Sequence, residues 1–145
     1  MSGESGVLIR LGSWDELAGV VTPIRFCVFV DEQGVPAEME LDEFDGLSRH
    51  AVALAGDVPV GTGRLLPDGH IGRMAVLVDW RGRGVGTALL ETLILEATRL
   101  GMAQLVLSAQ THALGFYARF GFVPEGDAYD EAGLLHQAMR KNLAG

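Results

Sequence analysis

The sequence predicts an α+β fold, with a central mixed, mostly antiparallel sheet flanked by helices. Its segments read strand, two helices, three strands, helix, strand, helix and two strands, and this mixed order is typical of α+β proteins. The length of 145 residues suits one domain. The composition, with 48% hydrophobic and 21% charged residues, is that of a globular protein. We therefore assign residues 1–145 to a single domain.

The N-terminal part is expected to contain one strand and two helices. Residues 7–11 alternate as in a strand. Ser13 and Glu16 have the spacing of a capping box, which marks the start of a helix. Thr22 followed by Pro23 is typical of an N-cap with proline in the first helical position, so we expect a second helix to begin there.

An antiparallel meander of three strands is expected after an acidic loop at residues 38–45. Gly56 and Asp57 separate the first two strands, and this order of residues favours a type II′ hairpin turn. Residues 67–69 form a second turn signal. The expected strands cover residues 50–55, 58–66 and 71–78.

The C-terminal half is expected to contain two helices and three strands. Its first helix has apolar residues at helical spacings, and Gly101 is a natural end for it. The expected elements are a helix over 84–100, a strand over 105–107, a helix over 112–120 and strands over 122–129 and 134–140.

The charge balance argues against nucleic acid as a partner. The chain has 11 basic and 19 acidic residues, a net charge of −8, whereas nucleic-acid binding depends on basic residues that neutralise phosphates. An acidic surface attracts protonated amines, although it also serves solubility alone. No apolar run is long enough to span a membrane, and the N-terminus lacks the layout of a secretory signal. We therefore expect a cytoplasmic protein without a membrane partner.

The sequence predicts neither a disulfide nor a metal site. Cys27 is the only cysteine, and no Cys/His spacing suggests metal ligands. Because Cys27 lies in an apolar stretch, we expect a buried, unreactive thiol.

The sharpest local signal is the segment DWRGRGVGT, residues 79–87, between a strand and the longest helix. Its glycines allow close backbone approach, and a helix N-terminus directs unpaired N–H groups and partial positive charge at an anion. Arg81 and Arg83 add charge that pairs with phosphate oxygens. The spacing fits neither the P-loop nor the dinucleotide-binding fingerprint. The segment therefore predicts a site for another pyrophosphate ligand, with a purely structural turn as the alternative.

Three motifs together resemble the GNAT family of N-acetyltransferases, in its ElaA/YjcF-like branch. The turn itself, Arg81-x-x-Gly84-x-Gly86, is similar to the family's CoA-binding motif. The other two motifs are Arg25-x-x-Val28-Phe29-Val30-x-Glu32-Gln33 and Gln110-x-x-Ala113-x-x-Phe116-Tyr117-x-x-Phe120-Gly121-Phe122. The resemblance covers nearly the whole chain, and it implies a GNAT-type fold and an acyltransferase that uses acetyl-CoA as co-substrate and needs no metal.

The resemblance also implies where acetyl-CoA binds. The backbone of the turn would hold the pyrophosphate, and the strand before it would pair with the pantetheine arm. A splay between that strand and the strand at 105–107 would admit the arm. A backbone N–H near Ala75 or Val76 would polarise the thioester carbonyl. The implied cofactor-binding residues are Met74, Ala75, Val76, Arg81, Gly82, Arg83, Gly84, Val85, Gly86, Thr87 and Gln110, the last of which replaces the Asn often found there.

Direct attack of an amine on acetyl-CoA in a ternary complex needs an acid for the departing thiolate and a base for the amine. Tyr117 occupies the family's tyrosine position, and a phenol with an ordinary pKa of about 10 can act as the acid. His112 lies close to the expected cofactor arm and suits proton relay. Glu32, Glu38, Asp42 and Asp45 are the candidate bases, because they lie where members of the family shape the acceptor pocket. These acidic residues could also bind the acceptor's ammonium group.

The acceptor is left open between small-molecule and peptide amines. Homodimers are frequent in the family, and the C-terminal strands could pair across a twofold axis. Two alternatives to an enzyme remain, a non-catalytic acetyl-CoA-binding sensor and an interaction protein whose glycine turn is only structural. Acetyl-CoA binding and turnover together would separate the three.

Overall fold

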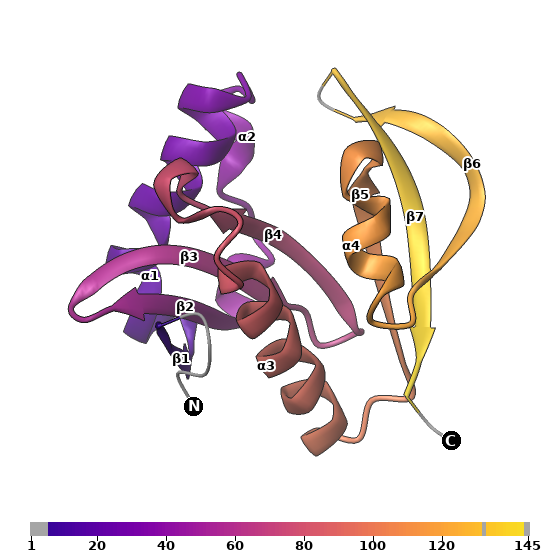
Figure 1. The fold of residues 1–145 in the computed structure, drawn as a ribbon, viewed down its shortest axis with the longest axis horizontal. Coiled ribbons are helices and arrows are strands. Elements are labelled where there is room, and N and C mark those ends of the chain that lie inside the picture. Colours follow the sequence, from indigo (N-terminus) through magenta and orange to yellow (C-terminus); the bar gives the residue numbers. More distant parts are fainter. Residues whose placement is uncertain (1–5, 132, 144–145) are drawn as a thin grey trace.

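The computed structural model describes residues 6–131 and 133–143. Seven strands form one sheet in the order β1-β2-β3-β4-β5-β7-β6 (Figure 1), and neighbouring strands are antiparallel except β4 and β5. The predicted α+β fold with a mixed, mostly antiparallel sheet is confirmed. The strands are β1 (Leu8–Gly12), β2 (Arg49–Ala55), β3 (Val58–Leu65), β4 (His70–Val76), β5 (Gln104–Gln110), β6 (Val123–Glu131) and β7 (Leu134–Asn142). Residues 1–5, 132 and 144–145 lie outside the described residues. The ends of the predicted domain, and the first residues of the N-terminal segment considered for a secretory signal, are therefore not described.

Helices cover both faces of the sheet. The helix α1 (Trp14–Arg25) packs on one face and α3 (Val85–Arg99) on the other. Successive strand residues point to opposite faces, so Val52 of β2 packs with the α1 cluster while its neighbour Ala53 packs with the α3 cluster. The other helical segments are a π-helix (Phe26–Glu32), α2 (Ala37–Glu40), α4 (Leu114–Ala118) and short 3-10 turns at Asp45–Leu47, Val78–Trp80 and Thr111–Ala113.

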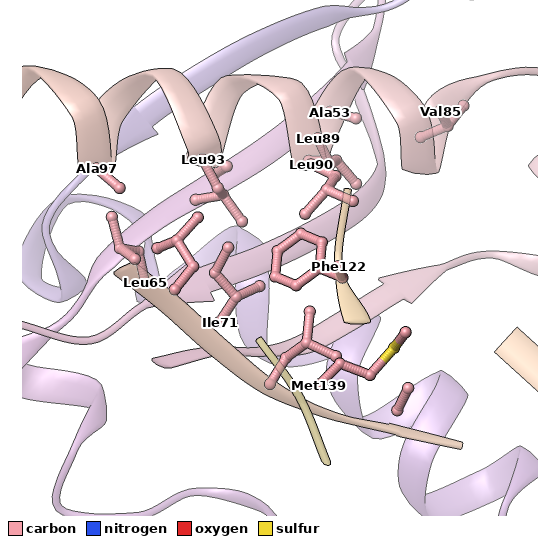
Figure 2. Packing of buried hydrophobic residues seen from close by; sticks show 14 of the residues in the cluster. Ala53, Leu65, Ile71, Val85, Leu89, Leu90, Leu93, Ala97, Phe122 and Met139 are labelled. Carbon is pink, nitrogen blue, oxygen red and sulfur yellow. The ribbon is translucent and has the colours of Figure 1, made fainter. Parts of the chain in front are cut away.

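The larger core joins the two halves of the sheet beneath α3 (Figure 2). Leu89 and Leu93 lie one helical turn apart and point from α3 towards Ile71 of β4, Phe122 and Met139 of β7. All five side chains are at most 3% exposed, and burying each contributes about 1.5–3 kcal/mol. Because this cluster contacts strands on both sides of the β4–β5 pair, it holds the two halves of the sheet at a defined angle.

The helix α1 begins as predicted but does not end as predicted. The Glu16 N–H donates to Ser13 Oγ at 3.3 Å and the Ser13 N–H donates to Glu16 Oε1 at 2.8 Å, which confirms the capping box. The predicted new helix at Thr22 is wrong, because α1 runs through Pro23 and passes directly into the π-helix. Buried apolar residues continue on the sheet side beyond the proline, so packing outweighs the hydrogen bond that Pro23 removes.

Two further expectations near this helix need correction. The stretch at 38–45 is not simply a loop, because Glu40 ends α2 and Asp45 begins a 3-10 turn, and both side chains are buried. Cys27 is exposed and not buried. The buried face of this helical segment passes through Ile24 and Val28, which directs the thiol away from the sheet.

The meander and the β4–β5 pair set up the site. Gly56 has a φ of +62° in a two-residue loop, and Asp57 is not among the positive-φ residues of the described chain, as the predicted type II′ turn requires. The strands β4 and β5 pair only at His70–Val106 and Ile71–Leu107. Beyond these residues the two strands separate (Figure 1), as the family resemblance implies.

Candidate active site

A cavity of about 990 Å³ opens where β4 and β5 separate. Its walls come from the diverging strands, the π-helix, the segment around α2 and the helix α4. Cavities of this size hold large ligands. Two features border this cavity: a glycine-rich turn and a cluster of buried charged side chains.

The first feature is the anion turn, which we define as residues 81–87. Gly84 caps α3 with a φ of +83° and Gly82 has a φ of +75°, both in the left-handed region that glycine adopts freely. Helical hydrogen bonding begins with the Ala88 N–H, which donates to Gly84 O at 3.0 Å. The N–H groups of the first turn therefore lack intrahelical partners and can bind an anion.

The side chains of the anion turn divide between the cavity and the surroundings. Arg81 and Gly86 line the cavity. Arg83 stacks over the Trp80 ring at 4.7 Å, and Val85 is buried in the core beneath α3. Of the predicted cofactor residues in this turn, Arg81 thus offers its side chain to the cavity, whereas Gly82, Arg83, Gly84, Val85 and Thr87 are not among the residues that line it.

Arg81 is already engaged by a carboxylate of the π-helix. Its Nη1 and Nη2 atoms donate to Glu32 at 2.6 and 2.7 Å, and its Nε donates to Val76 O at 2.9 Å. The hydrogen bond from Arg81 lowers the pKa of Glu32, against a small opposing effect of burial. Glu32 thereby occupies the fork of Arg81 in the way that a phosphate would.

The wall of the cavity that faces β5 is the edge of β4, which is not paired with another strand there. Met74, Ala75 and Val76 line the cavity. On one side β4 pairs with β3, at Thr62–Ala75 and Gly61–Val76, but towards β5 no described residue pairs with it beyond Ile71. Free N–H and C=O groups along such an edge can bind an extended ligand as an added strand.

Tyr117 projects from α4 into the same cavity. Its ring makes edge contacts with Phe116 at 5.0 Å and Phe122 at 6.0 Å. Burial raises the pKa of Tyr117 to about 12, so the phenol stays protonated at neutral pH. No described residue accepts a hydrogen bond from its hydroxyl, which leaves that hydroxyl available to a ligand.

Gln110 links the π-helix to His112. The Gln110 Nε2 donates to Gln33 Oε1 at 2.9 Å, and its Oε1 lies 2.8 Å from His112 Nε2. Since an amide oxygen only accepts, His112 Nε2 is the donor in this hydrogen bond, and Nδ1 has no partner among the described residues. Both side chains line the cavity.

The second feature is the ion cluster, in which three guanidinium groups face three carboxylates. Arg25 Nε donates to Glu40 Oε2 at 2.6 Å and its Nη1 donates to Asp45 Oδ1 at 2.7 Å. Both carboxylates are almost fully buried, and Arg25 itself is completely so. The members of the ion cluster are Arg25, Glu40, Asp42, Asp45, Arg64 and Arg73.

The ion cluster bears on whether the candidate bases can accept a proton. Asp42 lines the cavity, but Arg64 donates to it at 2.7 and 3.0 Å and Arg73 at 3.3 Å. Burial opposes ionisation of Asp42, yet these arginines outweigh it and the pKa of Asp42 is lowered, which disfavours a base. Glu38 is exposed and is not among the cavity-lining residues.

Sequence reasoning missed three residues of this wall, Glu40, Arg64 and Arg73. Glu40 lies within the acidic stretch, but its burial depends on partners 15 or more positions away. Gly72 followed by Arg73 inside a strand was the one available signal, because glycine in a strand often marks a bulge.

Within residues 6–131 and 133–143, no group of His, Cys, Asp or Glu side chains could hold a metal ion. In the same part of the chain, no helix has the length and apolar character needed to cross a membrane.

Known proteins resemble the chain over most of its length. The acetyltransferase (GNAT) domain family matches residues 18–143. The uncharacterized N-acetyltransferase YjcF from Bacillus subtilis is 39% identical over 123 residues, which cover 82% of this chain and 88% of YjcF. ElaA from Escherichia coli is 32% identical over 128 residues, 83% of this chain and 84% of ElaA. The crystal structure of an acyl-CoA N-acyltransferase from Pseudomonas aeruginosa superimposes with a TM-score of 0.85 over 93% of this chain and 99% of that one, at 30% identity.

Proposed function

This chain belongs to the acetyltransferase (GNAT) domain family, in its ElaA/YjcF-like branch, and on that premise we propose that it transfers the acetyl group of acetyl-CoA to an amine. The observation that carries the proposal is that the anion turn and the unpaired edge of β4 border one cavity. The turn suits the pyrophosphate of CoA and the edge suits the amide-containing pantetheine arm.

The proposed reaction is direct attack in a ternary complex. The amine nitrogen bonds to the thioester carbon, and a backbone N–H near Ala75 or Val76 stabilises the oxyanion. The carbon–sulfur bond then breaks, and the Tyr117 hydroxyl donates a proton to the departing thiolate. The amine gives up a proton to a base, so the net transfer moves one proton from nitrogen to sulfur. His112, with Nδ1 free, is the proposed relay among the candidates, whereas Glu38 and Asp42 are less well suited.

Two measurements on the purified protein test this proposal. Calorimetric titration with acetyl-CoA is expected to show binding, and an amine panel is expected to release free CoA thiol. Binding without thiol release from any amine would favour the non-catalytic sensor. Absence of binding would favour an interaction protein whose turn is only structural.

Gly84→Val is expected to weaken acetyl-CoA binding by about tenfold or more. A β-branched residue in the left-handed conformation of Gly84 costs about 1–2 kcal/mol, and its methyl groups would obstruct the N–H groups that face the anion. Calorimetry measures the affinity. Gly101→Val is the matched control, because Gly101 has a φ of +79° at the other end of α3 with nothing near its missing side chain. Equal acetyl-CoA affinity in the two variants would contradict the turn assignment.

Glu32→Gln is expected to strengthen acetyl-CoA binding by about two- to fivefold. The Glu32 carboxylate competes with phosphate for Arg81, and an exposed ion pair of this kind is worth up to about 1 kcal/mol. Asp31→Asn is the control, since Asp31 is exposed and belongs to the same π-helix but makes no ion pair with Arg81. An affinity unchanged or weakened in Glu32→Gln would show that the pair supports the turn and does not compete with the ligand.

The remaining expectations stay predictions. The acceptor is proposed to be a small-molecule or peptide amine, and the protein is proposed to act in the cytoplasm. Pairing of C-terminal strands across a twofold axis is compatible with β6, which forms one edge of the sheet and is exposed along its length.

A further inference from the structure

Besides the buried Nε of Arg64, two atoms of the ion cluster at the cavity wall have no hydrogen-bond partner among the described residues. Glu40 Oε2 accepts from Arg25, but no described residue donates to Glu40 Oε1. Arg73 donates through Nε and Nη2 to the α2 segment and to Asp42, but its Nη1 has no acceptor among the described residues. Both side chains line the cavity, so the unused acceptor and the unused donor belong to neighbouring residues of the same wall.

Arg73 adopts a backbone conformation that an arginine rarely occupies. Its φ is +50°, and it is the one non-glycine residue with positive φ in the described chain. The pairing of β3 with β4 shifts between Thr62–Ala75 and Arg64–Gly72, which inserts one extra residue into β4. Such bulges redirect a side chain, and strain of this kind is concentrated at functional sites.

The charges of the two groups are incompletely compensated. Burial raises the pKa of Glu40, even though Arg25 and Arg73 lower it. Burial lowers the pKa of Arg73, and the positive charges of Arg64 and Arg25 lower it further. The negative charges of Glu40 and Asp42 raise it, but not enough to cancel these effects. A ligand that brings a cation to Glu40 and an anion to Arg73 would stabilise both charged forms.

We propose that this wall is the acceptor site and that it recognises an α-amino acid, with the carboxylate on Arg73 and the ammonium group on Glu40. The carboxylate and the amine of such a molecule are separated by a single carbon, which matches two groups whose nearest atoms, Arg73 Nε and Glu40 Oε2, are 3.4 Å apart. The inference rests on the proposed function, because it names the amine that the acetyl group would reach.

The ion cluster disfavours the other acceptor classes. Its three arginines balance its three carboxylates, so the cluster itself offers no excess negative charge to a polyamine or an aminoglycoside, which would have to rely on Asp68 and Glu131 elsewhere on the cavity wall. A lysine side chain of a protein, or a peptide N-terminus, carries no adjacent carboxylate and would leave Arg73 Nη1 unpaired. The Arg73 side chain is 27% exposed, so water can satisfy Nη1 in the absence of a ligand, but a charge-assisted bond to a carboxylate is about twice as strong as a neutral hydrogen bond.

Binding to the CoA-saturated protein tests the inference without turnover. The panel contains the common α-amino acids, each beside its amide and its decarboxylated amine, titrated by calorimetry. At least one amino acid is expected to bind about tenfold more tightly than both of its analogues. Equal or tighter binding of the amide or the decarboxylated amine would overturn the inference, and so would a panel in which no amino acid binds.

Thiol release on the same panel separates this inference from the proposed function. An amino acid that binds but drives no thiol release overturns catalysis and leaves the acceptor site standing. Thiol release confined to amines without a carboxylate overturns the acceptor site and leaves catalysis standing.

Arg73→Gln provides the residue-level test. The affinity of this variant for the selected amino acid is expected to fall about tenfold, to the affinity of the wild-type protein for the amide. Its affinities for the decarboxylated amine and for acetyl-CoA are expected to stay unchanged. Arg73→Lys is expected to restore part of the loss. Arg10→Gln, which removes an exposed arginine of β1, is expected to change nothing. Equal weakening of the amino acid and of its decarboxylated amine in Arg73→Gln would assign Arg73 a purely structural role and overturn the inference, and the wild-type panel decides the matter if this variant does not fold.

Discussion

Tyr117→Phe is expected to lower kcat by about 10²-fold or more while acetyl-CoA affinity stays nearly unchanged. The substitution removes one oxygen atom and keeps the ring that contacts Phe116 and Phe122. If the hydroxyl acts only when sulfur departs, kcat and kcat/KM for the amine fall by the same factor. Steady-state thiol release and acetyl-CoA calorimetry measure the two quantities.

The titration of Tyr117 gives an independent check on its environment. Burial raises its pKa to about 12, so an ultraviolet titration of tyrosinate should lose its most alkaline transition in Tyr117→Phe. Tyr129→Phe is the matched control for turnover, since Tyr129 bonds to Ser108 on β5 and is not among the residues that line the cavity. Turnover at the wild-type rate in Tyr117→Phe would remove the phenol from the chemistry.

The order of the elements was predictable because the signals for it are local. The hairpin at Gly56, the capping box at Ser13 and the glycine after α3 each act within a few residues. Pro23 shows where such reasoning fails. Its local signal is a helix start, but α1 buries apolar residues on both sides of it, and packing against the sheet decides the outcome.

The anion turn and the ion cluster also differ in whether local sequence signals predict them. The anion turn could be predicted because nine consecutive residues contain both its glycines and its arginines. The ion cluster could not, because Arg64 meets Asp42 across 22 positions and Arg73 meets it across 31. In the sequence, the three acidic residues of the cluster predict a solvated loop. Only folding brings three arginines from other parts of the chain into contact with them.

Arg25→Met is expected to lower the free energy of unfolding by about 3–5 kcal/mol at neutral pH. Methionine approximates the aliphatic part of the arginine side chain, but it leaves Glu40 and Asp45 with charges that are buried and incompletely paired. Urea denaturation measures the change. Arg49→Met is the control, because Arg49 is 39% exposed and its partner Glu96 keeps a second ion pair with Arg99, so its loss should cost less than about 1 kcal/mol.

The pH dependence identifies the mechanism of this loss. Burial opposes ionisation of Asp45, but hydrogen bonds from Arg25 and the Asp42 backbone outweigh it and lower its pKa, so its stabilising effect is present above the unfolded pKa and is lost as pH falls. Without Arg25 the Glu40 carboxyl keeps only Arg73 as an ion-pair partner, and its pKa lies further above its unfolded value, so its penalty is present at neutral pH and disappears on protonation. The difference in unfolding free energy between wild type and Arg25→Met should therefore shrink between neutral pH and about pH 4. A loss no larger than that of Arg49→Met, constant over this range, would show that the cluster contributes no more than an exposed ion pair and does not hold α2 against the cavity.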